Sequence, residues 1–220
     1  MAIIVIGAGI AVIGLLAAIL IPASTGTPQL TGGGLGLSAS VLPDGEAGIA
    51  VEGPSNSLLY YHAAPGAQWT VSQVAADNTT FSAPSIYVRD VAPLGEADIV
   101  AEGPDHSLSY YWERVGGSWN PDEVAGPGST YSAPSIIVRS ADPASQADIT
   151  AEGPDSSLLY YYASPGAQVT ISQVAADNTT FSAPSFFVRP DGEADIAVEG
   201  PSYSLLYYHA TPGAQWTVSL

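Results

Sequence analysis

The sequence predicts a mainly β protein in which an apolar N-terminal α-helix precedes a four-bladed β-propeller of about 50-residue repeats. Three observations predict this fold class. The N-terminal stretch is apolar and uncharged, one short motif recurs four times, and strand-like alternation runs through each repeat. With 46% hydrophobic residues, the 220-residue chain can build a sizeable core.

Residues 1–22 contain no charged or polar side chain. As a helix they would span about 32 Å, roughly the thickness of a bilayer core. Small residues lie among the Ile and Leu residues and allow helices to approach closely. The helix residues expected to make such contacts are Ile3, Ile6, Gly7, Ile10, Ala11, Ile13, Gly14, Leu16, Ala17, Ile21 and Pro22.

A Gly-rich linker is expected over residues 23–34, followed by a propeller over residues 35–220. The motif Glu-Gly-Pro recurs at spacings of 50, 50 and 47, and a Tyr-Tyr pair follows it each time. Each repeat contains four strand-like runs separated by turn residues, which predicts one four-stranded antiparallel sheet per repeat. The expected blades cover approximately residues 35–80, 81–130, 131–180 and 181–220. We expect the four to close into a ring within one chain; a sandwich and a two-chain, eight-bladed ring are the alternatives.

The charge balance excludes several function classes. Four Arg, no Lys and 21 acidic residues give a net charge of −17, so nucleic acid is not an expected partner. The chain has no Cys, which removes disulfides and thiol chemistry. No nucleophile elbow, metalloprotease motif or phosphate loop occurs, so we predict no enzyme activity and no cofactor.

Aromatic residues supply the candidate binding site. Trp112 and Trp119 flank a Gly-Gly turn and are the residues we expect to stack on a sugar ring. Trp69 and Trp216 share this chemistry, whereas the repeated tyrosines are expected to pack between blades. These tyrosines are Tyr60, Tyr110, Tyr160 and Tyr207.

The polar motifs have simpler expected roles. Asp98, Asp148, Asp195 and the loop 191–195 could offer oxygen ligands to calcium, but turn formation is favoured and no metal site is predicted. Asn78 and Asn178 each begin an Asn-Thr-Thr sequon and are candidate N-glycosylation sites. The repeated arginines are expected to pair with local acids; they are Arg89, Arg139 and Arg189.

The N-terminal segment resembles the mature N-terminus of a type IV pilin. The residues that match this family's helix run from Ile10 to Ala23 in the same order and register. Val5 stands where the bacterial members usually carry a glutamate. The resemblance covers residues 1–23 and implies processing by a prepilin peptidase and assembly of the helix into a filament core.

The repeats more loosely resemble bacterial propeller lectins that bind fucose and related sugars. The second repeat carries the likeness, with Ser-Ala-Pro-Ser at residues 82–85 and Ser-Tyr-Tyr-Trp at residues 109–112. The resemblance implies a propeller with glycan-binding grooves between blades.

Together these features predict a pilin-like structural subunit of an extracellular, cell-surface filament with a propeller head for adhesion. Its expected partners are other copies, through the N-terminal helices, the export and pilus assembly machinery, and glycans. The alternative is a membrane-anchored carbohydrate-binding propeller lectin.

Overall fold

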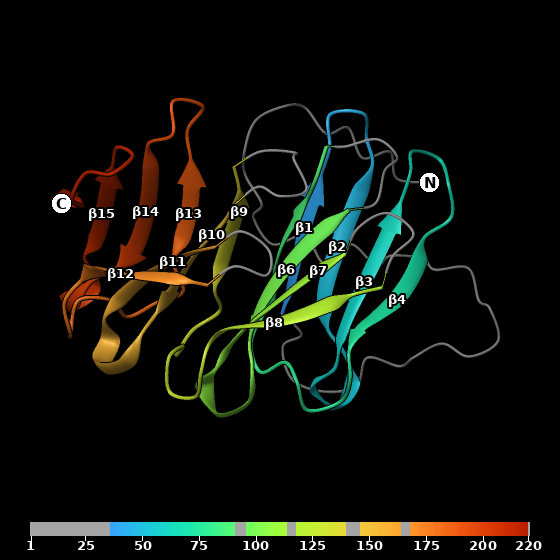
Figure 1. Cartoon of the computed structure of the whole chain (residues 1–220), viewed down its shortest axis with the longest axis horizontal. Coiled ribbons are helices and arrows are strands. Elements are labelled where there is room, and N and C mark those ends of the chain that lie inside the picture. The colour runs from blue at the N-terminus through green and yellow to red at the C-terminus, as the bar shows by residue number, and fades with distance from the viewer. Residues whose placement is uncertain (1–35, 91–95, 114–117, 140–145, 164–167, 220) are drawn as a thin grey trace.

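The protein is described by a computed structural model that covers residues 36–90, 96–113, 118–139, 146–163 and 168–219. These residues form four antiparallel sheets, each a meander of four consecutive strands (Figure 1). We call the sheets blades 1 to 4 in chain order. The strands of blades 1 and 2 are β1 (Leu37–Val41), β2 (Ala47–Glu52), β3 (Leu58–Ala63), β4 (Thr70–Ala75), β5 (Ser85–Val88), β6 (Ala97–Glu102), β7 (Leu108–Glu113) and β8 (Asn120–Ala125). Those of blades 3 and 4 are β9 (Ser135–Val138), β10 (Ala147–Glu152), β11 (Leu158–Ala163), β12 (Thr170–Ala175), β13 (Ser185–Val188), β14 (Ala194–Glu199), β15 (Leu205–Ala210) and β16 (Thr217–Ser219).

The Glu-Gly-Pro motif ends the second strand of every blade. In blade 2 the backbone N–H of Glu102 donates to Ser82 Oγ at 3.1 Å, which joins this motif to the Ser-Ala-Pro-Ser segment. A Cβ on Gly103 would lie 2.4 Å from Ser107 Oγ, so a larger residue here would force that side chain to move. A 3-10 turn follows in each blade, namely η1 (Pro54–Asn56), η2 (Pro104–His106), η3 (Pro154–Ser156) and η4 (Pro201–Tyr203).

Three hydrophobic clusters lie in the gaps between successive blades. Consecutive residues of a strand point to opposite faces, so each blade supplies side chains to two gaps. In β11, Tyr160 belongs to the cluster between blades 3 and 4, and Tyr161 belongs to the cluster between blades 2 and 3. Both faces of the inner blades are therefore covered by sheets.

The expected closed ring of four blades is wrong. Strand β1 packs against β5, β5 against β9 and β9 against β13, but no comparable contact joins β13 to β1 in the described part of the chain. The four blades form an open arc, with blade 4 at one end and blade 1 at the other (Figure 1). The repeat pattern indicates that neighbouring sheets cover the faces of the inner blades. It does not contain the angle between sheets, which depends on side-chain volume in each gap.

The predicted fold class, a helix followed by a four-bladed propeller, is corrected accordingly. The described residues form strands and 3-10 turns but no α-helix. They also contain no helix long and apolar enough to cross a membrane. The expected helix over residues 1–22 and the linker over residues 23–34 lie outside the described residues.

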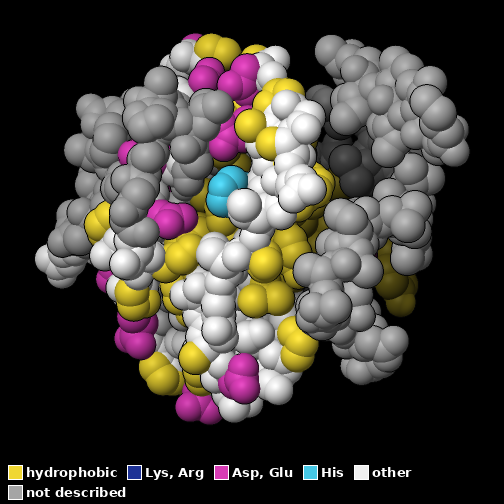
Figure 2. All heavy atoms as spheres, turned by 90° about the vertical axis from the view of Figure 1, so that its right-hand side faces the viewer, with side chains coloured by type: hydrophobic (Ala, Val, Ile, Leu, Met, Phe, Trp, Pro, Cys, Tyr) yellow, Lys and Arg dark blue, Asp and Glu magenta, His cyan; other side chains and the backbone are white. Residues whose placement is uncertain are grey.

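The two ends of the arc expose apolar side chains whose equivalents inside it are buried or half-buried. Figure 2 faces the blade 1 end and shows hydrophobic side chains gathered across it between acidic ones. Exposed apolar residues include Leu37 and Val41 in blade 1 and Phe187 and Leu205 in blade 4.

Burial between blades predicts which core substitution destabilises the protein. We expect Leu158→Ala to lower the free energy of unfolding by about 2–5 kcal/mol, because the side chain is fully buried between blades 3 and 4. Ile171→Ala, on the neighbouring strand and 55% exposed, should change it by less than about 0.5 kcal/mol. Urea unfolding followed by circular dichroism measures both, and equal losses would contradict the packing of blade 3 on blade 4.

Candidate functional site

Each gap between blades receives side chains from the same repeated positions. In blades 2 to 4 an arginine follows the first strand, and the second strand carries an aspartate. The third strand of every blade carries a tyrosine and another ring two residues later. The following blade contributes a residue from just before its fourth strand. From blade 1 to blade 4, the residue after the first strand is Leu42, Arg89, Arg139 and Arg189, and the second-strand position is Gly48, Asp98, Asp148 and Asp195. The third-strand tyrosine is Tyr60, Tyr110, Tyr160 and Tyr207, and the ring two residues later is His62, Trp112, Tyr162 and His209. The position before the fourth strand is Trp69, Trp119, Val169 and Trp216.

The gap between blades 3 and 4 holds an open pocket of about 480 Å³. Its volume lies within the range of small-molecule binding sites. Blade 3 lines it with Arg139, Gln146, Tyr160 and Tyr162, and blade 4 lines it with Trp216 and the loop at residues 211–214. The pocket therefore combines hydrogen-bonding groups with aromatic rings.

Arg139 is held in place by a network at the base of this pocket. Its Nη2 donates to Tyr160 Oη at 3.0 Å and its Nη1 donates to Gly192 O at 3.3 Å, while its Nε is paired with Asp148 Oδ2. Gln146 Nε2 donates to Asp148 Oδ1 at 2.6 Å. The side chain of Arg139 remains 29% exposed, so its guanidinium is both oriented and accessible from the pocket.

This network shifts the ionisation of its members. Burial, and then the charge of Asp148, raise the pKa of Tyr160 well above the usual value near 10. Burial alone would lower the pKa of Arg139, but its hydrogen bond to Tyr160 and the charge of Asp148 outweigh burial and raise it. The tyrosine stays protonated and the arginine stays charged at neutral pH.

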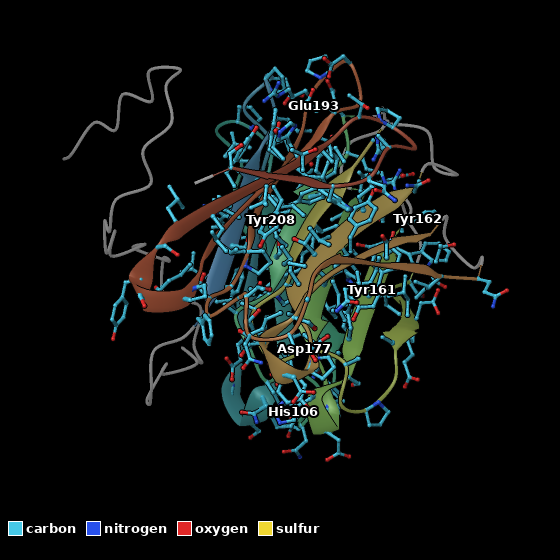
Figure 3. All side chains as sticks on the ribbon, turned by 90° about the vertical axis from the view of Figure 1, so that its left-hand side faces the viewer. His106, Tyr161, Tyr162, Asp177, Glu193 and Tyr208 are labelled. Carbon is cyan, nitrogen blue, oxygen red and sulfur yellow. The ribbon has the colours of Figure 1, made fainter. Side chains whose placement is uncertain are left out.

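Aromatic rings form one side of the pocket. Trp216 and Tyr160 are in edge contact with ring centroids 5.5 Å apart, and Tyr160 and Tyr162 are 5.6 Å apart. Tyr161 and Tyr162, both labelled in Figure 3, are successive residues of β11 and pack into the hydrophobic clusters on opposite sides of blade 3. Only Tyr162 of this pair lines the pocket between blades 3 and 4. Such a wall suits the apolar face of a small ring-shaped ligand.

The gap between blades 2 and 3 has the equivalent arginine, aspartate and tyrosine but is closed. Arg89 and Asp98 are fully buried, and Arg89 donates to both carboxylate oxygens, from Nε at 2.5 Å and from Nη2 at 3.0 Å. Val169 stands where Trp216 stands in the next gap and packs with Trp112 against the core. The cavity there measures about 10 Å³, which is too small for a ligand.

The gap between blades 1 and 2 lacks the ion pair. Leu42 and Gly48 replace the arginine and the aspartate, and the hydroxyl of Tyr60 is buried without a hydrogen-bond partner in the described structure. Trp119 packs edge-on against Tyr60, with ring centroids 5.3 Å apart, and its Nε1 donates to Ser72 Oγ at 3.3 Å. This gap is filled by aromatic packing.

The structure does not bring the two predicted sugar-stacking residues together. Trp112 lies in the gap between blades 2 and 3, and Trp119 lies in the gap between blades 1 and 2. Sequence reasoning named Trp216 among the tryptophans that could stack on a sugar but favoured Trp112 and Trp119, gave Arg139 a structural ion pair, and did not single out Gln146. The signal that could have found them was the repeat alignment, since only the third gap combines Arg and Trp at the repeated positions.

Local structure gives the polar motifs clear roles. The repeated arginines pair with the repeated aspartates, as expected. These aspartates are the acids that the sequence offered as calcium ligands. Asn78 and Asn178 have left-handed backbones, and Gly128 takes the equivalent place in blade 2. The sequons therefore coincide with a turn that favours Asn or Gly. Both asparagines are exposed, and their glycosylation stays a prediction.

Comparisons with solved structures relate this fold to propeller lectins. The BP39L lectin of Burkholderia pseudomallei superimposes with a TM-score of 0.68 at 13% identity over 86% of this chain and 57% of that one. AofleA of Arthrobotrys oligospora gives 0.65 at 15% identity, over 84% and 56%. The Aleuria aurantia lectin, a six-bladed β-propeller that recognises fucose, gives 0.63 at 13% identity, over 84% and 60%. No family model matches the chain, and no curated protein matches it in sequence.

These comparisons support the lectin resemblance and correct the filament interpretation. The chain spans less than two thirds of the length of the propellers it matches, and the one described as six-bladed has more blades than the predicted ring of four. The matching structures named above include lectins and no pilin. The interpretation of the chain as a pilin-like subunit of a helical filament is therefore wrong. The absence of enzyme activity stays a prediction.

The raised pKa of Tyr160 predicts how stability depends on alkaline pH. The unfolded chain releases this proton near pH 10 and the folded chain releases it only at higher pH, so stability falls as pH rises above about 10. Tyr160→Phe removes this contribution. We expect the slope of unfolding free energy against pH between 10 and 12 to become shallower by up to about 1.4 kcal/mol per unit.

Urea unfolding at a series of pH values measures this slope. Leu158→Ala is the control, because it lowers stability without removing an ionisable group and should leave the slope unchanged. An unchanged slope in Tyr160→Phe would mean that the hydroxyl is not held between Arg139 and Asp148.

Proposed function

We propose that this chain is a carbohydrate-binding propeller module and that its binding site is the pocket between blades 3 and 4. The observation that carries the proposal is one open gap in which an oriented arginine, an amide and a tryptophan face the same space. The lectin structures on which the four blades superimpose support it.

The ligand class follows from the pocket's chemistry. Trp216 offers a ring on which the apolar face of a sugar stacks, and Arg139 and Gln146 offer donors to sugar hydroxyls. The net charge of −17 repels anionic sugars, so a neutral saccharide is favoured. Ala194, Ala210 and Pro212 line the pocket as well and suit the methyl group of a 6-deoxy sugar.

Fucosides are the first ligands to test. The Aleuria aurantia lectin has been crystallised with α-methyl-L-fucoside, and that sugar has both the methyl group and the neutral hydroxyls that this pocket suits. The extracellular, cell-surface location expected from the sequence remains part of the proposal, since a glycan-binding module meets such ligands there.

Calorimetric titration of the 220-residue chain with α-methyl-L-fucoside, preceded by a glycan array, tests the proposal. We expect binding that weakens at least tenfold in both Trp216→Ala and Arg139→Gln, because the first removes the stacking ring and the second the oriented charge. Trp119→Ala is the matched control, since it truncates the equivalent side chain in a gap without the arginine and should leave affinity unchanged. A chain that binds nothing on the array, or that binds equally well without Trp216, would refute this site.

A further inference from the structure

The outer face of blade 4 repeats a surface that a following blade covers everywhere else in the arc. Leu205 begins β15 and is 70% exposed, whereas the leucines at the same position of the other blades are fully buried by the following sheet. Those leucines are Leu58, Leu108 and Leu158. Phe187 is exposed on β13 of the same blade. Blade 4 thus presents one half of a blade-to-blade interface.

The outer face of blade 1 presents the other half. Val41 is 58% exposed, although the equivalent Val88 and Val138 are 2% exposed where they contact the preceding blade. Trp69 is 40% exposed, and the equivalent Trp119 and Trp216 are packed against a tyrosine of the preceding blade. Figure 2 shows the hydrophobic side chains at this end, with no Arg side chain visible among them.

Blade 4 also carries the polar half of a binding site. Arg189 Nε donates to Asp195 Oδ2 at 2.7 Å, and its Nη2 donates to Tyr207 Oη at 2.9 Å. This is the arrangement of Arg139, Asp148 and Tyr160 in the third gap. Glu193 occupies the position in blade 4 that Gln146 occupies in blade 3, and its Oε1 lies 3.3 Å from Arg189 Nη1. Figure 3 shows Glu193 at the opposite end of the molecule from His106. The half-site needs only an aromatic residue from a following blade.

We propose that the missing neighbour is a second copy of this chain, whose blade 1 packs on blade 4 of the first and whose Trp69 completes a second site over Arg189. The internal interfaces support this occupant, because every gap in the arc joins these two kinds of face. The contact is head-to-tail, so each copy keeps one more face for a further contact. Two copies joined at both ends bring eight blades into one ring, the upper end of the usual range for propellers.

The assembly does not depend on sugar binding, whereas the composite site rests on the proposed function. Each copy carries a net charge of −17, so copies repel each other at low ionic strength. Salt screens this repulsion, and association is therefore expected to increase with ionic strength.

Sedimentation and light scattering of the 220-residue chain test the assembly. We expect a mass of twice the 22.5 kDa of one chain, and a loss of association of at least tenfold in Leu205→Glu and in Val41→Glu. Both residues are exposed, so the variants should fold, which circular dichroism checks. Ile171→Glu, on a 55% exposed residue of an inner blade, is the control and should leave the mass unchanged. A monomer, or an oligomer that neither end-face variant disrupts, would overturn the proposal.

Disulfide trapping tests the register of the contact, since the chain has no cysteine. Inside the arc, Ser38 Oγ accepts from Ile86 N at 3.3 Å, and Ser85 Oγ accepts from Ile136 N at 3.2 Å. The equivalent pair across the new junction is Ser185 and Ala39. Mixing the single variants Ser185→Cys and Ala39→Cys under oxidising conditions should give a covalent heterodimer, and failure to form it would rule out this junction.

Sugar stoichiometry separates the two proposals. With a composite site the associated chain binds two sugars per copy, and Trp69→Ala reduces this to one while Trp216→Ala removes the other. An associated chain with one sugar per copy, unaffected by Trp69→Ala, refutes the composite site and leaves the pocket between blades 3 and 4 intact. An associated chain that binds no sugar refutes the proposed function but not the assembly.

Discussion

The structure depends on one constraint: a sheet with bulky side chains on both faces must have each face covered by another sheet. Each inner blade sends alternate residues of its strands into two gaps, and the core of the described residues consists of the three clusters in those gaps. No blade has a core of its own, so its stability comes from its neighbours. An arc of blades therefore always has two faces that its own sheets leave uncovered.

The same repeated positions give different gaps because a few residues differ. Where Val169 faces the arginine position, the gap closes, and Arg89 is buried against Asp98. Where Trp216 faces it, the gap holds an open pocket that Gly192 also lines, and Arg139 stays accessible. An ion pair that is structural in one gap is thus available for ligand binding in the next.

Much of the sheet architecture could be predicted from the repeats, but the arrangement of the site could not. Trp112 and Trp119 flank one turn and look like a pair in the sequence. In the structure Trp112 is paired with Asn120, and paired residues of neighbouring strands lie on the same face of a sheet. Trp119 precedes Asn120 by one residue and therefore faces the other side of blade 2. The period-2 pattern contains this information only once the pairing register is known. Ring closure was not predictable either, because it depends on packing volumes in the gaps, which no strand pattern encodes.

Apolar surface and net charge have opposite effects on association at the ends of the arc. Inside the arc the equivalent faces are covered by a neighbouring sheet, as the full burial of Leu158 shows. An apolar face left in water lowers stability and promotes association. The high negative charge works in the opposite direction, because it keeps copies apart at low ionic strength. Repulsion acts over about a Debye length, whereas apolar contact acts only where faces fit. Charge therefore suppresses non-specific contact between copies, while the one contact that buries both end faces gains most from burial of apolar surface.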